Sequence, residues 1–231
     1  MTVYQCSLSP TVRQRHLEAM AITEWIRASI AVVRSNLRAY VVLNVSYYGV
    51  VAVAMIVVAS HPEVQEALTQ AVVASFTQGP LSTVFDAYAG GKVLTAIVLT
   101  FAVNFFLGSV LVLFAPSLLI PFAGVAIGLI RATLWGLLLA PTTPELQVAM
   151  IPHSLTLVLE GQGYILAMLG AFVLGKAFVS PSSVGVTRWR DGYLRGLRQE
   201  GRIYLLVALV LAVAAVYEVL EVIYLVPRIL P

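Results

Sequence analysis

The sequence predicts an all-α membrane protein, a polytopic helical bundle with about five transmembrane spans. Of its 231 residues, 60% are hydrophobic and only 11% are charged. Soluble domains carry about 25% charged residues, so this chain cannot cover a soluble surface of its size. In addition, five stretches each contain about 20 mostly apolar residues, which is the length that a membrane-spanning helix needs.

These stretches divide the chain into a cytoplasmic N-terminal helix, residues 1–38, and a transmembrane bundle, residues 39–231. The expected spans are about 39–60, 93–115, 117–140, 149–176 and 203–226. Only residues 115–117 separate the second span from the third, which predicts a tight helical hairpin. Residues 61–92 are too polar to span; we expect two short surface helices, with a re-entrant hairpin as the alternative.

The basic residues predict the orientation. Eleven of the fourteen Lys and Arg residues lie before the first span or between the fourth and the fifth. Lys92 and Arg228 lie on the opposite side, and Arg131 falls inside the third span. Because basic residues accumulate in cytoplasmic loops, the N-terminus is expected in the cytoplasm and the C-terminus outside.

Two basic segments are candidate surfaces for lipid or protein partners. Residues 11–38 can form an amphipathic helix, with apolar positions at Leu17, Met20, Ile22, Trp25, Ile26 and Ile30. Its arginines suit anionic headgroups, although it can equally be a plain helix that leads into the first span. A second basic surface is expected from Arg188, Arg190, Arg195, Arg198 and Arg202. Beside a membrane, this surface favours lipid headgroups or an acidic partner over nucleic acid.

The spans contain polar residues that a plain anchor would not need: Asn104, Arg131, His153, Glu160, Glu218 and Glu221. Such residues usually face a bundle interior or a water-filled cavity, because they are costly in lipid. The helical rise places four of them in one layer, with His153 and Glu221 nearer the outer end. Arg131 and the two carboxylates at its depth can neutralise one another. Two interpretations stay open: a substrate, ion or proton path, and a structural network that fixes helix packing.

Small residues and a proline indicate how the spans pack. Gly124 and Gly128 form a GxxxG pattern in the third span, which lets helix backbones approach closely. Pro152 lies near the start of the fourth expected span, where a missing amide hydrogen is tolerated.

Motifs that support catalysis are absent from the sequence. It has no HExxH, GxSxG or phosphate-loop pattern. Its single cysteine, Cys6, excludes a cysteine metal cluster. We therefore expect no catalytic residue, no metal site and no cofactor.

The stretch from 101 to 175 resembles the stage II sporulation protein M family of integral membrane proteins. The matching positions are Phe101, Asn104 and Gly108, then Gly124 and Gly128, then Pro152, His153 and Glu160. The chain departs from the family pattern at Ala123, where Asn is common, and at Leu157, where the family has its Glu. The resemblance implies a multi-pass protein of the prokaryotic cytoplasmic membrane that recruits partners and is not itself a hydrolase.

These observations lead to two expected functions. The first is a non-enzymatic integral membrane subunit that scaffolds or recruits other membrane proteins in a larger complex. The second is a permease or the membrane component of a transporter, which would use the intramembrane polar layer.

Overall fold

The computed structural model describes residues 10–79 and 81–230, with side chains from residue 23 onward. Every regular element in these ranges is helical, which confirms the all-α prediction there. Four helical stretches are long and apolar enough to cross a membrane: Leu37–Val58, Val93–Leu119, Pro144–Val179 and Trp189–Ile229. The third expected span corresponds to a shorter apolar helix, Ala123–Leu139.

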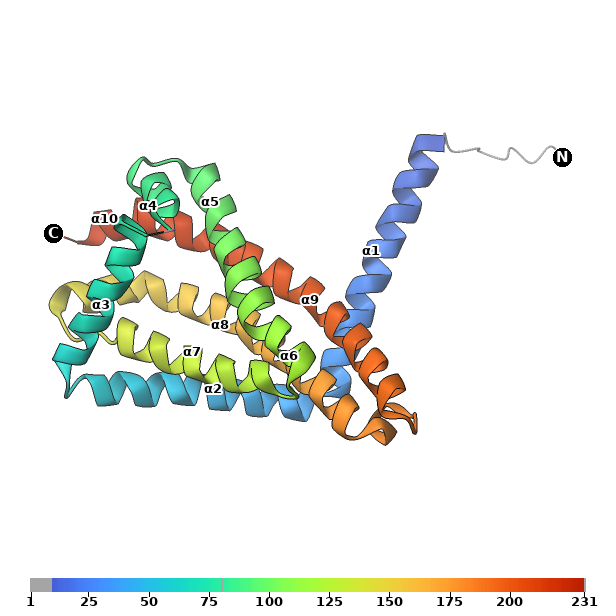
Figure 1. Cartoon of the computed structure of the whole chain (residues 1–231). Coiled ribbons are helices and arrows are strands. Elements are labelled where there is room, and N and C mark those ends of the chain that lie inside the picture. Colours follow the sequence, from blue (N-terminus) through green and yellow to red (C-terminus); the bar gives the residue numbers. More distant parts are fainter. Residues whose placement is uncertain (1–9, 80, 231) are drawn as a thin grey trace.

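Helix α8 (Pro144–Val179) is the centre of the bundle. Of its most apolar stretch, 72% is buried, against 28% for α2 (Leu37–Val58). In Figure 1, α2 and α7 (Ala123–Leu139) run alongside α8, and α9 (Trp189–Leu220) crosses the bundle obliquely. The polar residues of α8 therefore face other helices on most sides.

The second span is longer than expected. Helix α5 (Val93–Ala102) continues into a π-helix, η1 (Val103–Phe114), and then into α6 (Ala115–Leu119). The turn lies at residues 120–122, so the expected turn at 115–117 was wrong. Pro116 lies within this continuous helical stretch, which runs past the proline to Leu119. Ser117 closes the real turn by accepting a hydrogen bond from the Gly124 amide at 2.8 Å.

The last helix also begins earlier than the expected 203. After a short 3-10 turn, η2 (Pro181–Val184), helix α9 starts at Trp189 and runs on through η3 (Glu221–Leu225) and α10 (Val226–Ile229). Much of the expected basic loop is therefore helical. Packing outweighs the poor helix propensity of glycine here, because Gly192 and Gly196 press against Ala177 of α8.

Two short helices close one end of the bundle. They are α3 (Pro62–Thr77) and α4 (Ser82–Ala89), and the expected break between them is present, although residue 80 lies outside the described residues. Gln65 of α3 is buried and donates to the carbonyl oxygens of Leu138 and Ala140 at 3.0 and 2.8 Å. These bonds fix α3 across the end of α7.

Helix α1 (Pro10–Ser35) is separated from α2 by Asn36 and runs steeply across the direction of α2 (Figure 1). Ser29 is buried and donates to the Arg202 carbonyl oxygen of α9 at 2.7 Å. Trp25 and Ile30 are exposed, and Ile26 is half-buried. The expected apolar positions Leu17, Met20 and Ile22 lie outside the described side chains.

Candidate functional site

A chain of hydrogen bonds links three helices at the centre of the bundle. Asn104 of η1 donates from Nδ2 to Glu160 Oε1 of α8. Tyr164, one turn further along α8, donates from its hydroxyl to Asn104 Oδ1 at 3.1 Å. Arg131 of α7 in turn donates from Nη2 to the Tyr164 hydroxyl at 2.7 Å. Glu160 and Tyr164 are 2% and 0% exposed and Asn104 is buried, so the middle of this chain is closed to solvent, whereas Arg131 at its end is only half-buried.

Arg131 does not make the direct carboxylate pair that the sequence suggested. Within the described residues, no carboxylate oxygen lies within ion-pair distance of its guanidinium. Instead, the guanidinium lies 4.0 Å from the Tyr164 ring centre and 5.4 Å from that of Trp135. Aromatic faces attract cations, so the two rings partly replace the expected carboxylates. Arg131 is instead linked to Glu160 by hydrogen bonds through Tyr164 and Asn104.

The carboxyl groups of Glu160 and Glu218 face each other across the contact between α8 and α9, within hydrogen-bonding reach. Each has one buried oxygen, Oε2, that lacks a partner among the described groups. Two adjacent carboxylates cannot both be ionised in a water-poor interior, because their charges repel at short range. A proton shared between the two groups would supply the missing donor and leave the pair with a single negative charge.

A second polar cluster lies nearer the end that α3 and α4 cover. His153 Nδ1 lies 2.9 Å from Glu221 Oε1, and Thr156 donates from its hydroxyl to Glu221 Oε2. Glu221 is fully buried, whereas 19% of the His153 side chain is exposed. His153 and Glu160 therefore both meet the last helix, but at different carboxyl groups.

Pro152 lies inside α8 rather than near its start, because the helix begins at Pro144. The expected tolerance of a first-turn proline does not apply. A proline within a helix removes one internal hydrogen bond. The carbonyl oxygen of Pro152 accepts a hydrogen bond from the Tyr217 hydroxyl of α9 at 3.0 Å. This contact ties α8 to α9 beside the His153–Glu221 pair.

Further polar side chains lie beyond the site residues expected from the sequence. Gln162 accepts a hydrogen bond from the Tyr40 hydroxyl at 2.5 Å and donates to Asn44 Oδ1 at 2.7 Å, which joins α8 to α2. Asn44 and Gln162 are themselves polar residues within spans, and this signal could have found them. Glu200 of α9 is fully buried, and neither of its carboxylate oxygens has a partner among the described groups. It was missed because we placed it in a cytoplasmic loop.

The expected packing glycines lie at close helix contacts. A methyl group on Gly108 would lie 3.1 Å from the Tyr164 hydroxyl oxygen. One on Gly124 would lie 2.7 Å from the Leu113 carbonyl oxygen, and one on Gly128 would lie 2.5 Å from Met168 Sδ. Gly136, which we did not select, presses on the Val51 backbone of α2. These contacts hold α7 tightly between α2, α8 and η1.

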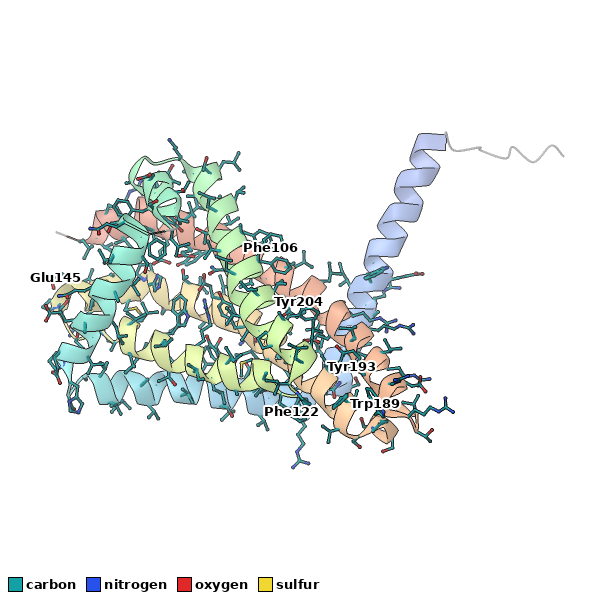
Figure 2. The ribbon with its side chains drawn as sticks, viewed as in Figure 1. Phe106, Phe122, Glu145, Trp189, Tyr193 and Tyr204 are labelled. Atoms are coloured by element: carbon teal, nitrogen blue, oxygen red, sulfur yellow. The ribbon has the colours of Figure 1, made fainter. Side chains whose placement is uncertain are left out.

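The five arginines of the expected basic surface, Arg188, Arg190, Arg195, Arg198 and Arg202, are all exposed. Arg195 donates to the Val184 carbonyl oxygen at 2.7 Å, and the Arg190 guanidinium lies over the Trp189 ring. Figure 2 shows Trp189 and Tyr193 near the turn between α8 and α9, where both pack on Phe178. These aromatic contacts hold the start of α9, and therefore its arginines, against the end of α8.

Three open cavities lie away from the polar network. One of about 590 Å³ is lined by Glu24, Trp25 and Ala28 of α1 with Arg198, Gly201 and Arg202 of α9. One of about 380 Å³ lies where α1 gives way to α2, and one of about 620 Å³ lies between α2 and α7. In the described part of the chain, no cluster of three or more His, Cys, Asp or Glu side chains is arranged to hold a metal ion.

Four membrane-length apolar helices around a buried polar network define an α-helical membrane protein. No family model, curated protein or solved structure matches this chain. The resemblance to the stage II sporulation protein M family stays a prediction.

Proposed function

We propose that this chain is a non-enzymatic, multi-pass membrane subunit that recruits partners in a larger membrane complex. In this proposal α7 also crosses the membrane, which brings the number of spans to five. Its 17 residues give a length of about 25 Å, close to the hydrocarbon thickness. The basic end of the bundle faces the cytoplasm, which puts the N-terminus inside and the C-terminus outside. By the family resemblance, the membrane is the prokaryotic cytoplasmic membrane.

The observation that carries this proposal is the surface that α1 and α9 form beyond the bundle. It consists of the cavity lined by Trp25, Arg198 and Arg202, together with the exposed arginines at the start of α9. Aromatic and arginine residues dominate binding energy in protein interfaces. The closed polar network and the close glycine contacts would hold the bundle rigid beneath this surface.

Affinity purification of the tagged full chain from its native membrane in a mild detergent tests this proposal. We expect a stoichiometric partner that is lost in a variant with Arg198→Glu and Arg202→Glu. Arg228→Glu is the matched control, because Arg228 is equally exposed but lies at the opposite end of the chain's last helix. A chain that purifies alone, or a partner that both variants retain, would contradict the proposed surface.

A second candidate function, a membrane transport component, is favoured by the Glu160–Glu218 pair. A purely structural network gains little from two buried carboxylate oxygens without a donor. Such a pair can instead take up and release one proton. His153, which is partly exposed and lies nearer the end covered by α3 and α4, would pass the proton between the pair and that end. The closed network then corresponds to an occluded conformation.

Proton flux in proteoliposomes that contain a trapped pH indicator tests this second function. We expect an imposed membrane potential to drive flux through the wild type, and Glu160→Gln to abolish this flux while the chain still assembles. Glu145→Gln, an exposed residue at the start of α8, is the control. Equal flux in empty and protein-containing vesicles would contradict the transport function.

A further inference from the structure

A pocket of about 380 Å³ lies at the break between α1 and α2, where both helices meet the last turns of α8. Ser35 and Asn36 line it from the break, Arg38 and Val42 from α2, and Phe172 and Lys176 from α8. In Figure 1 the junction of α1 with α2 and the last turns of α8 lie at the same end of the bundle as the start of α9, where the exposed arginines are found.

Two cations reach this pocket from helices that are far apart in the sequence. Arg38 and Lys176 are both exposed, and within the described residues neither has a carboxylate within ion-pair distance. A cation at the end of a spanning helix needs no special explanation by itself, since basic residues mark the cytoplasmic boundary. Two unpaired cations that line one pocket make a site for a negatively charged group.

The same two helices repeat one arrangement of charged and apolar residues. Val42 follows Arg38 by one helical turn on α2, and Phe172 precedes Lys176 by one turn on α8. Residues four apart share a helix face, so each helix presents a cation and, one turn deeper in the bundle, an apolar side chain. Val42 is 55% exposed, so the apolar part of the pocket opens toward the lipid-facing surface of α2.

We propose that this pocket binds an anionic phospholipid. The phosphate lies between Arg38 and Lys176, and one acyl chain follows Val42 and Phe172 toward the bilayer centre. Basic pockets between transmembrane helices suit anionic headgroups, and the exposed apolar wall favours a lipid over a free phosphate ion. This site is separate from the Trp25–Arg198–Arg202 surface and does not depend on either proposed function.

Lipid binding to the full chain, purified in detergent and stripped of its own lipid, tests the proposal. Phosphatidylglycerol or phosphatidylcholine is added, and bound lipid is counted by native mass spectrometry alongside the unfolding temperature. We expect selective binding and thermal stabilisation by phosphatidylglycerol. Since a basic residue near an anionic lipid contributes about 1 kcal/mol, Arg38→Gln and Lys176→Gln should each weaken binding about fivefold.

Matched controls separate the site from general charge effects and from free phosphate. Arg228→Gln removes one exposed charge at the other end of the chain and should bind phosphatidylglycerol as the wild type does. Inorganic phosphate at the same concentration should give no stabilisation. Retention by the Arg38→Gln, Lys176→Gln double variant at the wild-type level would overturn the site, and equal stabilisation by inorganic phosphate would overturn its assignment to a lipid.

Discussion

Tyr164 stands between Arg131 and Asn104: its hydroxyl accepts from Arg131 Nη2 at 2.7 Å and donates to Asn104 Oδ1 at 3.1 Å. A single hydroxyl group thus connects the one basic residue of the third expected span to the Asn104–Glu160 bond. The guanidinium also lies over the ring of the same tyrosine. Both contacts depend on a residue that carries no charge.

Tyr164→Phe should destabilise the bundle while leaving the ring beneath Arg131 in place. It leaves Asn104 Oδ1 and Arg131 Nη2 without this buried partner, a loss that typically costs about 1–3 kcal/mol. Equilibrium unfolding in mixed detergent micelles measures the change. Tyr224→Phe is the control, because Tyr224 is 45% exposed and its hydroxyl makes no described hydrogen bond. If the two variants are equally stable, the Tyr164 hydroxyl contributes nothing to the stability of the bundle.

The facing carboxyl groups of Glu160 and Glu218 predict a protonated carboxylic acid inside the bundle at neutral pH. Infrared spectroscopy detects its carbonyl stretch apart from the bands of ionised carboxylates. We expect this band in the wild type and a smaller or absent band in Glu160→Gln, because the glutamine amide can donate to an ionised Glu218 in place of the shared proton.

The control for this spectrum is Glu145→Gln, which changes an exposed acid and should leave the band unchanged. Glu200 is a second buried acid, so Glu200→Gln distinguishes its contribution from that of the pair. A wild-type spectrum without a protonated carboxyl band would contradict the shared proton and would favour a bound cation at the pair.

The sequence predicted the helical class and the positions of most long apolar helices, because long apolar runs have few alternative structures. It failed where packing decided the outcome. The turn before α7 was misplaced because Pro116 does not end the helix, which continues through it to Leu119. The start of α9 was misplaced because glycines that pack on α8 permit a helix that propensity disfavours.

The same distinction applies to the polar residues. Their presence in the spans was visible in the sequence, since each is costly in lipid. Their pairing was not, because it depends on the rotation of each helix. His153 meets Glu221, Glu160 meets Asn104 and Glu218, and Arg131 meets an uncharged tyrosine. Helical spacing tells which residues share a face of one helix, but not which residues of a neighbouring helix that face meets.

Gly136→Ala should be among the more damaging small substitutions in the bundle. A methyl group there would overlap the Val51 backbone oxygen and lie 2.6 Å from Ala54 Cβ, so α2 and α7 would have to separate. Inserting a methyl into such a tight contact costs about 1–3 kcal/mol. Gly49→Ala is the matched control on α2, since nothing lies within 4 Å of its added methyl group. The unfolding temperature should fall for Gly136→Ala only, and a fall of equal size in both variants would argue against this contact.

Glu200→Met should stabilise the chain. Glu200 is fully buried on α9, and both of its carboxylate oxygens lack a hydrogen-bond partner among the described groups. Burying a polar group without such a partner costs about 1–3 kcal/mol. The Glu200 side chain packs closely on Gly170 of α8, where an added methyl group would lie only 3.0 Å from Glu200 Cγ. Methionine has the same unbranched stem, so it should pack in the same space. The expected gain is of the size of that cost, measured by equilibrium unfolding in detergent.

Glu66→Met, a substitution of the same kind at an exposed position within α3, should change stability by less than about 0.5 kcal/mol. A fall in stability for Glu200→Met would contradict this expectation. Glu200→Gln then separates shape from polarity, because glutamine has the same length as glutamate and keeps a polar group at this fully buried position. A loss confined to Glu200→Met would show that methionine does not fit the space that Glu200 fills, and equal losses in both variants would show that the carboxyl group itself stabilises the chain.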